Sequence, residues 1–279
     1  DSTVKVSGIV LDDQIIFGAS GTTTNDLQTI AQAPVAKSTL GEQRTAVVMW
    51  STNTSSTYTV DQIKNAFFAE PNVNPKSVNA YFKEGSFGQT WFTGDVFAVY
   101  NPPSPSGDCF GQFPLTLNQL VLDSTGVDVT QYPRIVYLGS GCGDAAAYNS
   151  YAHVSSISGG YTYHELGHVL SINHANSLRC GTKQIDIFSN CSNIEYGDHY
   201  TSMGANASGG GQAPFQFNAP HKAMLSWLPQ SKIQYITTDG TYTVYASEKT
   251  QPGPQLLSIY KPDFNQYYDD GSIRAKGYL

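Results

Sequence analysis

Hydrophobic and polar positions follow two different periods along the middle of the chain, and together they predict a layered fold. Residues 45–50 and 134–138 are short apolar runs between polar neighbours, which is typical of buried strands. Residues 89–100 alternate with a period of two, as expected of a third strand, with Gly94 as a bend or a bulge. Other segments have the spacing of helices.

Three helices are predicted among these strands. Thr59 and Gln62 have the spacing of a capping box, so a helix should start there and end before Pro71. A second helix is predicted over residues 74–85 and a third over residues 116–125. Strands that alternate with helices indicate an α/β or α+β fold with a mixed, largely parallel sheet.

The N-terminal part has a weaker pattern. Residues 4–17 alternate enough for a strand or a hairpin, and residues 18–43 are a connection rich in Gly, Thr and Ala. We therefore separate an N-terminal β segment, residues 1–43, from a central domain, residues 44–232. The segment is either the remnant of a propeptide or a strand added to the central sheet.

Residues 233–279 are predicted to form a β-rich C-terminal subdomain. Its three short strands should cover residues 233–236, 241–246 and 256–260, with Gly and Pro turns between them. Residues 263–271 carry enough oxygen atoms for calcium but lack the spacing of an EF-hand loop. A solvated turn is the simpler interpretation, so calcium is possible but cannot be assigned.

Composition and charge narrow the class of protein. Of the 279 residues, 40% are hydrophobic and 13% are charged, and the net charge is −7. Without a basic run, nucleic acid and anionic membranes are poor candidate partners, and no apolar run approaches the roughly 18 residues of a membrane helix. We expect a secreted monomer. Its first residues are not a signal peptide, so an exported form would be processed, and a continuation past Leu279 stays open.

The four cysteines lie too far apart in the sequence for a zinc ribbon. Two disulfide bonds are the economical interpretation, most simply Cys109–Cys142 and Cys180–Cys191, although three pairings are possible. Four buried thiols are the alternative, because cysteine is commonly buried even when reduced.

Three histidines and a glutamate fall within eleven positions and predict a zinc site. His164 and His168 are four residues apart, so on a helix they share one face and can bind one metal ion. Glu165 lies one step round the same helix and can reach water at that ion without binding the ion itself.

His174 can join this site only if the helix ends early. On a continued helix it would lie about 240° round from His168 and about 9 Å along the axis. The helix should therefore stop just after Leu170, and the turn requires a residue with positive φ. That residue is Ser171, at a cost on the order of 1 kcal/mol, or else the turn slips to Asn173.

Two segments resemble a known family. Residues 164–174 resemble the extended HExxHxxGxxH motif of the metzincin zinc peptidases, with Ser171 in place of the glycine. Residues 196–204 are similar to the Met-turn segment of the gametolysin (autolysin) branch, and residues 217–228 to the helix that follows it. The resemblance covers about residues 163–228. It implies a metzincin-like zincin catalytic domain, in which a twisted mixed sheet supports the active-site helix.

The resemblance also implies roles for individual residues. The zinc ligands would be His164, His168 and His174, with Glu165 as general base. Met203 would form an apolar floor beneath the histidine rings and would not bind zinc itself. The implied activity is that of a secreted zinc metalloendopeptidase that hydrolyses internal peptide bonds of proteins.

Some alternatives remain open for ligands and substrate binding. Glu195 and His199 are competing third ligands, but His174 has the better spacing, whereas His153 and His221 are expected to be packed or surface histidines. In metzincins an edge strand pairs with an extended peptide substrate, and the corresponding stretch here comprises residues 145–155. A surface loop packed by its own tyrosines is the other interpretation of that stretch.

Two other classes of function are compatible with the motifs. One is a secreted adhesion or binding module that keeps zinc without catalysis, which the departure at Ser171 favours and the intact Glu165 disfavours. The other is a zinc hydrolase of a non-peptide amide or ester. The natural substrate, its cleavage preference and the mode of latency cannot be derived from the sequence.

Overall fold

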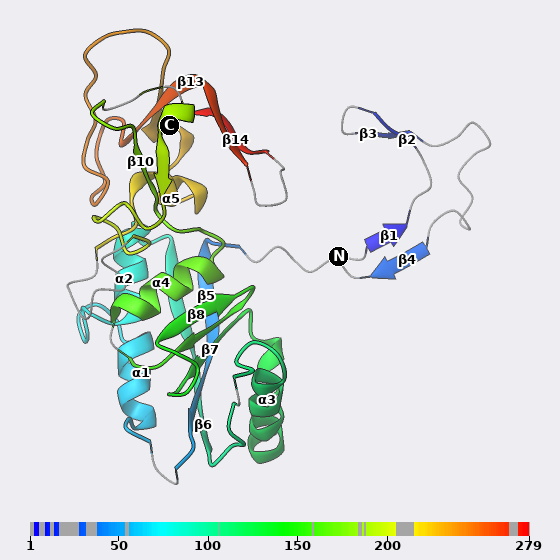
Figure 1. Cartoon of the computed structure of the whole chain (residues 1–279). Helices are drawn as coiled ribbons and strands as arrows, with labels where there is room; N and C mark the ends of the chain where they lie inside the picture. The colour runs from blue at the N-terminus through cyan, green and yellow to red at the C-terminus, as the bar shows by residue number, and fades with distance from the viewer. Residues whose placement is uncertain are drawn as a thin grey trace. The chain divides into compact units, whose positions relative to one another are not determined.

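The computed structural model divides the chain into two compact units, Asp1–Ser38 and Thr39–Leu279 (Figure 1). The structure describes residues 38–259 except for 54–55, 106, 158, 184–185, 187 and 205–214. Outside that range it describes only the backbone of six strands.

The larger unit is built on a five-stranded sheet with the order β6-β5-β7-β9-β8. β5 pairs in parallel with β6 and with β7, β7 pairs in parallel with β9, and β8 is an antiparallel edge strand. The sheet is therefore mixed and largely parallel, as predicted. Its strands are β5 (Gly41–Ser51), β6 (Thr90–Tyr100), β7 (Arg134–Leu138), β8 (Ala145–Tyr148) and β9 (Tyr151–Val154).

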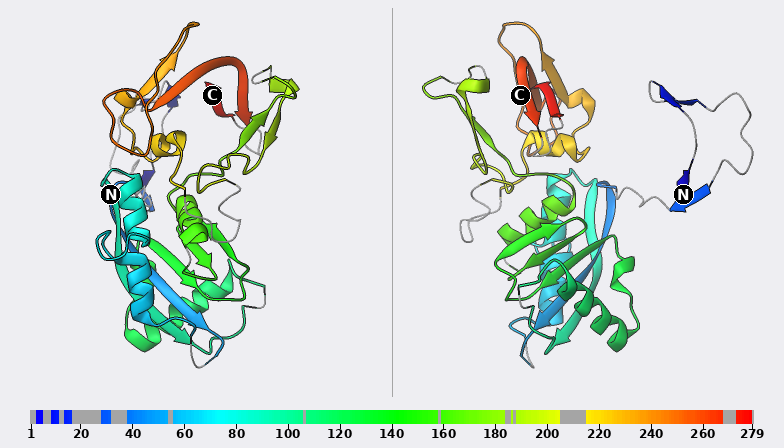
Figure 2. Two further views of the ribbon diagram at one scale, coloured as in Figure 1. Left: turned by 90° about the vertical axis from the view of Figure 1, so that its left-hand side faces the viewer. Right: turned by 45° about the vertical axis from the view of Figure 1, so that its right-hand side comes forward.

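Helices cover both faces of this sheet (Figures 1 and 2). Alternate residues of β5 separate the two cores: Val47 and Met49 pack among residues of the helices α1, α2 and α4, whereas Val48 and Trp50 pack against α3. The helices are α1 (Val60–Phe68), α2 (Val78–Gly85), α3 (Gln112–Thr125) and α4 (Gly159–Val169).

The caps explain where these helices begin. The capping box of Thr59 and Gln62 is confirmed, with both reciprocal hydrogen bonds at the start of α1. α2 begins after Ser77 and not at residues 74–75, because the Ser77 hydroxyl accepts the backbone N–H of Ala80 at 2.9 Å. α3 begins four residues earlier than predicted, where Asp108 accepts the N–H of Gln112.

Gly94 marks a close approach of two backbones and not a bulge. The register of β5 and β6 runs unbroken through the pair Thr45 and Gly94. A Cβ atom at Gly94, whose φ is 154°, would lie 1.8 Å from the carbonyl oxygen of Thr45. Only glycine leaves room for the neighbouring strand here.

The N-terminal unit has two separate strand pairs. β2 (Ile9–Leu11) and β3 (Gln14–Ile16) form the hairpin that residues 4–17 predicted. β1 (Thr3–Lys5) pairs with β4 (Gln28–Ala31), a strand that the sequence did not indicate. Both interpretations of this segment, a propeptide remnant or an added strand, stay predictions.

Near the C-terminus, β12 (Ile233–Ile236), β13 (Leu256–Tyr267) and β14 (Ile273–Tyr278) form a three-stranded sheet. The predicted strand 241–246 is wrong, because Tyr245 donates its N–H to Pro254 O and Gln255 holds Ala246 O in a loop. The solvated turn expected over 263–271 is replaced by strand as far as Tyr267, and residues 268–271 lie outside the described part. The predicted boundary between residues 232 and 233 stays a prediction.

Shorter elements connect the main helices and strands. The helix expected within residues 217–228 is α5 (Ala219–Met224), and β10 (Ser177–Arg179) and β11 (Ser192–Ile194) form a small hairpin. Among the described residues, single turns of 3-10 helix are η2 (Val129–Gln131), η3 (Phe188–Asn190) and η5 (Gln230–Lys232). Within the described residues no helix is both long and apolar enough to cross a membrane.

Both predicted disulfide bonds are confirmed. Cys109 is bonded to Cys142 and Cys180 to Cys191, with S–S distances of 2.08 and 2.06 Å. Disulfide bonds form and persist in oxidising compartments, so this pairing fits an extracellular protein.

Candidate metal centre

The first two histidines lie on helix α4, which packs on one face of the sheet. It packs over β8 and β9, and its apolar residues Tyr163, Leu166 and Val169 lie in the core beneath it. The helical period of 3.6 residues places His164 and His168 together on its opposite side, in the cleft. The residue after His164, Glu165, lines the same cleft.

The end of α4 turns the chain back towards these histidines. Ser171 has φ 72°, and the N–H groups of Ser171 and Ile172 donate to the carbonyl oxygens of His168 and Gly167. This pair of hydrogen bonds is the Schellman motif, which ends a helix at a residue of positive φ. The predicted positive φ at Ser171 is confirmed, whereas Asn173 does not have positive φ and the alternative turn is wrong.

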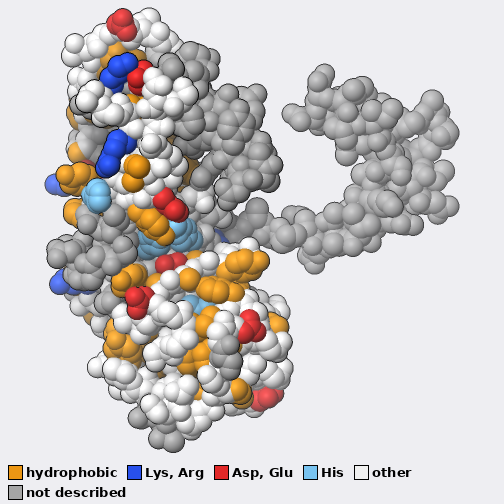
Figure 3. Space-filling model, in the orientation of Figure 1, with side chains coloured by type: hydrophobic (Ala, Val, Ile, Leu, Met, Phe, Trp, Pro, Cys, Tyr) orange, Lys and Arg blue, Asp and Glu red, His pale blue; other side chains and the backbone are white. Residues whose placement is uncertain are grey.

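The early end of α4 brings His174 to the first two histidines. One ligand atom from each of His164, His168 and His174 can be chosen so that all three lie within 4.8 Å of one another. Among the described residues these three form the group that could hold a metal ion, and Glu195 and His199 are not part of it. Figure 3 shows a patch of histidine side chains on the surface, with acidic and hydrophobic side chains beside it.

Each of the three rings is oriented by an acceptor at Nδ1. The Nδ1 of His164 lies 2.8 Å from Ser202 O, and that of His168 lies 2.9 Å from Ile172 O. The Nδ1 of His174 lies 2.7 Å from a carboxylate oxygen of Glu195. Carbonyl and carboxylate oxygens only accept, so each Nδ1 carries a proton, and the lone pair that each ring can offer to a metal ion is the one on Nε2.

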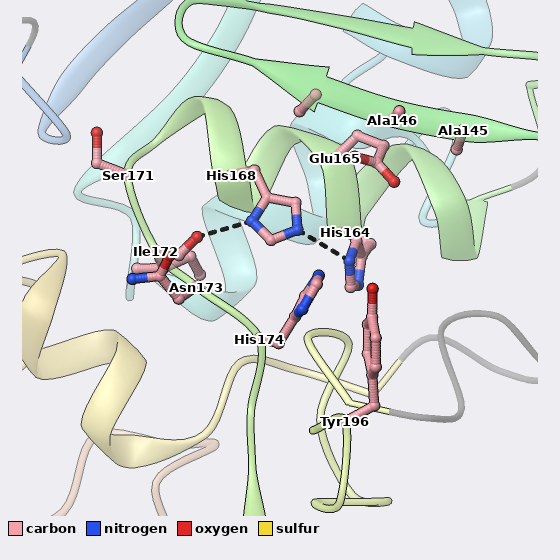
Figure 4. Close-up of a pocket in the computed structure, with 11 residues that line it drawn as sticks. Ala145, Ala146, His164, Glu165, His168, Ser171, Ile172, Asn173, His174 and Tyr196 are labelled. Carbon is pink, nitrogen blue, oxygen red and sulfur yellow. Dashed lines mark hydrogen bonds between the residues drawn. The ribbon is translucent and has the colours of Figure 1, made fainter. Parts of the chain in front are cut away.

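Two of these lone pairs face one another across a short gap. The Nε2 atoms of His164 and His168 are 3.0 Å apart (Figure 4). Burial lowers the pKa of His164 to about 4 and also lowers that of His168, which keeps both rings neutral near pH 7. Two bare nitrogen lone pairs repel at this distance unless a cation lies between the rings.

The donor set fits zinc. Tetrahedral coordination with Zn–N bonds of 2.0–2.1 Å places two nitrogen ligands about 3.3 Å apart, close to the separation of the Nε2 atoms of His164 and His168. Three imidazoles with one coordination position left over are also the ligand pattern of catalytic rather than structural zinc. The ion itself is not identified by the geometry.

Glu165 faces the cavity beside this group. The cavity has a volume of about 550 Å³ and is bordered by Ala145, Ala146 and Ala147 of the edge strand β8. Glu165 is 6% exposed, and burial raises the pKa of its carboxyl group to about 7. Figure 4 places its side chain between α4 and β8.

Met203 is fully buried beneath α4. A Cβ atom at Gly167, in the turn of α4 between the two histidines, would lie 2.5 Å from the Met203 sulfur. The carbonyl oxygen of Met203 accepts the N–H of Ala175, the residue that follows His174. The segment around Met203 therefore contacts both parts of the chain that carry the histidines.

The β10–β11 hairpin places two further residues beside His174. The Cys180–Cys191 disulfide closes this hairpin, and the residues after β11 are Glu195 and Tyr196. The Tyr196 ring centroid lies 3.8 Å from that of His174. Burial raises the pKa of Tyr196, and the carboxylates of Glu195 and Glu165 raise it further.

Sequence reasoning named most of these residues but missed Tyr196. The sequence indicates Glu195 only as a competing ligand, whereas in the structure its carboxylate contacts Nδ1 of His174. His153 and His221 are buried and do not belong to the group, as expected of packed histidines. The signal for Tyr196 was its place next to Glu195, but the hairpin that returns it to His174 cannot be read from local periodicity.

The comparisons with known proteins leave the family open. No protein-family model matches this chain, and a search of curated proteins gave no significant match. The structure itself shows a mixed α/β fold with a group of three histidines at helix α4.

Proposed function

We propose that this chain is a secreted zinc-dependent endopeptidase that hydrolyses internal peptide bonds of proteins. One observation carries the proposal: three histidines whose ligand atoms can lie within 4.8 Å of one another share a cavity with a buried glutamate and an open strand edge. A structural zinc site is normally closed by four protein ligands, and it has no use for a carboxylate beside it.

His164, His168 and His174 would hold the zinc ion through Nε2. When bound, the ion would supply Lewis acidity, which makes water more acidic and polarises a carbonyl group. The acceptors at Nδ1 would keep the three rings in the required tautomer and orientation. The buried Met203 would close the space below the rings against water.

Glu165 would move the proton. Its carboxylate would take a proton from the attacking water as the water oxygen bonds to the carbonyl carbon. The same carboxyl group would then give that proton to the amide nitrogen while the C–N bond breaks. A pKa near neutrality suits a group that must accept and donate in one cycle.

The edge strand β8 would bind the substrate. β8 pairs with β9 on one side only, so its other edge can form backbone hydrogen bonds with an extended peptide. Its residues Ala145, Ala146 and Ala147 line the cavity, and their short side chains leave room for the side chains of a peptide. Such pairing supports selection of extended protein segments over small amides or esters.

Hydrolysis of casein by wild type and by Glu165→Gln tests this function, with bound zinc quantified in both samples. We expect wild type to cleave and Glu165→Gln to lose at least about 100-fold in rate, because general base catalysis contributes this much or more. The exposed Glu42→Gln is the matched control and should keep full activity.

Three results would contradict the proposal. Equal activity of wild type and Glu165→Gln would exclude Glu165 as the general base. Zinc-loaded wild type that cleaves no protein, but binds one, would indicate a binding module. Cleavage restricted to small amides or esters would indicate a hydrolase of another class.

A further inference from the structure

Tyr196 occupies the cavity without a role in the proposed proton transfer. Its ring lies against His174 at 3.8 Å between centroids and stacks beside His164 at 6.0 Å and 24°. It also lines the same cavity as Glu165. A tyrosine in this place either only packs against the histidines or also acts on what the cavity binds.

The backbone at Tyr196 is held in an unfavourable conformation. Its φ is 57°, which for a bulky residue costs on the order of 1–2 kcal/mol. The N–H of Tyr196 donates to Asn176 Oδ1 at 3.2 Å, and the neighbouring Glu195 is hydrogen-bonded to His174. These contacts fix the backbone at Tyr196, so that the phenol ring stays beside the histidines. Packing alone does not require an aromatic residue at positive φ.

The direction of the side chain distinguishes the two roles. In Figure 4 the Tyr196 hydroxyl points towards His164, on the side of the cavity where Glu165 lies. Within the described part of the chain no hydrogen bond engages this hydroxyl. A phenol O–H is a donor near neutral pH, so the cavity contains one hydrogen-bond donor for a bound oxygen atom.

We infer that Tyr196 is a catalytic residue of the proposed peptidase, which donates a hydrogen bond to the oxyanion that develops on the scissile carbonyl. This inference rests on the proposed function. The oxyanion gains negative charge only in the transition state, so a donor aimed at it accelerates the reaction without tighter binding of the ground state. Glu165 would serve the attacking water and Tyr196 the carbonyl oxygen.

The conservative variant Tyr196→Phe separates catalysis from packing, because it keeps the ring and removes only the hydroxyl. Removal of one oxyanion donor typically lowers kcat about 100-fold to 1000-fold. We therefore expect such a loss in kcat for a fluorogenic peptide, with KM within about threefold of wild type. Tyr200→Phe is the matched control, since Tyr200 is 82% exposed in the same segment, and it should behave as wild type.

Two measurements besides activity complete the test. Zinc affinity from chelator competition should be equal in wild type and Tyr196→Phe, because the ring that packs against His174 is kept. Calorimetric binding of a phosphinic peptide, which presents a tetrahedral centre with an anionic oxygen, should weaken in Tyr196→Phe by a factor comparable to the loss in kcat. Binding of an uncleaved peptide to Glu165→Gln and to Glu165→Gln/Tyr196→Phe should be equal.

The outcomes separate this inference from the proposed function. Wild type that hydrolyses no peptide overturns both. Active wild type with an equally active Tyr196→Phe overturns the catalytic role alone. A Tyr196→Phe variant that loses zinc, or that loses kcat without weaker binding of the phosphinic peptide, shows that Tyr196 only positions the histidines.

Discussion

At the scale of single residues, two small side chains decide whether the histidines can meet. Ser171 accepts positive φ so that the chain can turn after α4, and Gly167 leaves space for the Met203 sulfur below the helix. Both positions lie within four residues of His168. Each can be tested by a change of one or two atoms in the side chain.

Replacement of Ser171 should follow the cost of positive φ. Ser171→Gly removes the steric cost but adds freedom to the unfolded chain, so we expect a free energy of unfolding up to about 1 kcal/mol higher. Ser171→Val should lower it by about 1–3 kcal/mol, since a β-branched residue is least tolerant of this φ. Urea unfolding of the zinc-loaded proteins measures both. The exposed Asn173→Val, at a position without positive φ, is the control; equal effects of the two valines would refute the explanation.

Gly167→Ala should destabilise the protein by about 1–3 kcal/mol through overpacking. The added methyl group would lie 2.5 Å from the Met203 sulfur, in a place with no exposed surface to move into. A double-mutant cycle with Met203→Ala checks the cause. The cost of Gly167→Ala should be smaller in the Met203→Ala background, and additive effects would show that the two residues do not interact.

At the scale of elements, α4 is fixed at its C-terminal end by the sheet. Arg134 of β7 is 3% exposed, and its Nη1 donates to Val169 O, the carbonyl of the last residue of α4. Burial lowers the pKa of Arg134 to about 10, which leaves it charged at neutral pH. A cation at a helix C-terminus is favourable, so this buried hydrogen bond anchors the end of α4 on the sheet.

The second element that shapes the site is the β10–β11 hairpin with its disulfide bond. Cys180→Ser/Cys191→Ser should weaken zinc binding, because Glu195 and Tyr196 follow directly after this hairpin. The lost disulfide bond joins cysteines 11 residues apart in the sequence, so its removal should also lower the free energy of unfolding by up to about 3 kcal/mol. Chelator competition and urea unfolding measure the two effects.

The other disulfide bond provides the matched control. Cys109→Ser/Cys142→Ser removes a bond with a sequence separation of 33 that involves no residue of the histidine group. It should lower stability by a similar or larger amount and leave zinc affinity unchanged. Equal losses of zinc affinity in both double variants would show that the hairpin has no special part in holding the site.

At the scale of the whole molecule, the core opposite α4 contains a buried histidine that makes stability depend on pH. His153 is 2% exposed and is surrounded by the rings of Phe110, Tyr137 and Tyr151. Burial lowers its pKa to about 4, and the backbone of Cys109 opposes this lowering. The unfolded chain binds this proton near pH 6.5, well before the folded protein does.

Stability should therefore fall as pH drops from about 6.5 to 4, because the unfolded state takes up the proton first. His153→Phe removes the histidine that binds this proton. Between pH 6.5 and pH 4 the free energy of unfolding of wild type should therefore fall by on the order of 3 kcal/mol relative to that of the variant. Urea unfolding of the zinc-free proteins at several pH values measures it. In zinc-free protein His164 and His168 contribute equally to both curves. Parallel curves would contradict the prediction.

How far the sequence predicts the structure depends on whether the signal is local. The buried strand 134–138 was predicted with its correct bounds because all five of its side chains are buried, and the capping box at Thr59 is a contact between neighbours. The alternation over 241–246 was misleading, because β12 and β13 pair in parallel and the chain between them forms a connection rather than a strand. Tyr196 was missed because its place beside His174 depends on the pairing of β10 with β11.

The way in which the three rings are held also limits when the site exists. The carbonyl oxygen of Ser202, which accepts from Nδ1 of His164, lies 38 residues from that histidine in the sequence. The carboxylate of Glu195, which accepts from Nδ1 of His174, lies 21 residues from His174. An incompletely synthesised or unfolded chain therefore lacks the ligand geometry even when it already contains all three histidines. If the chain is a peptidase, its own folding acts as a safeguard: the enzyme becomes able to cut only once it has become compact enough to resist being cut.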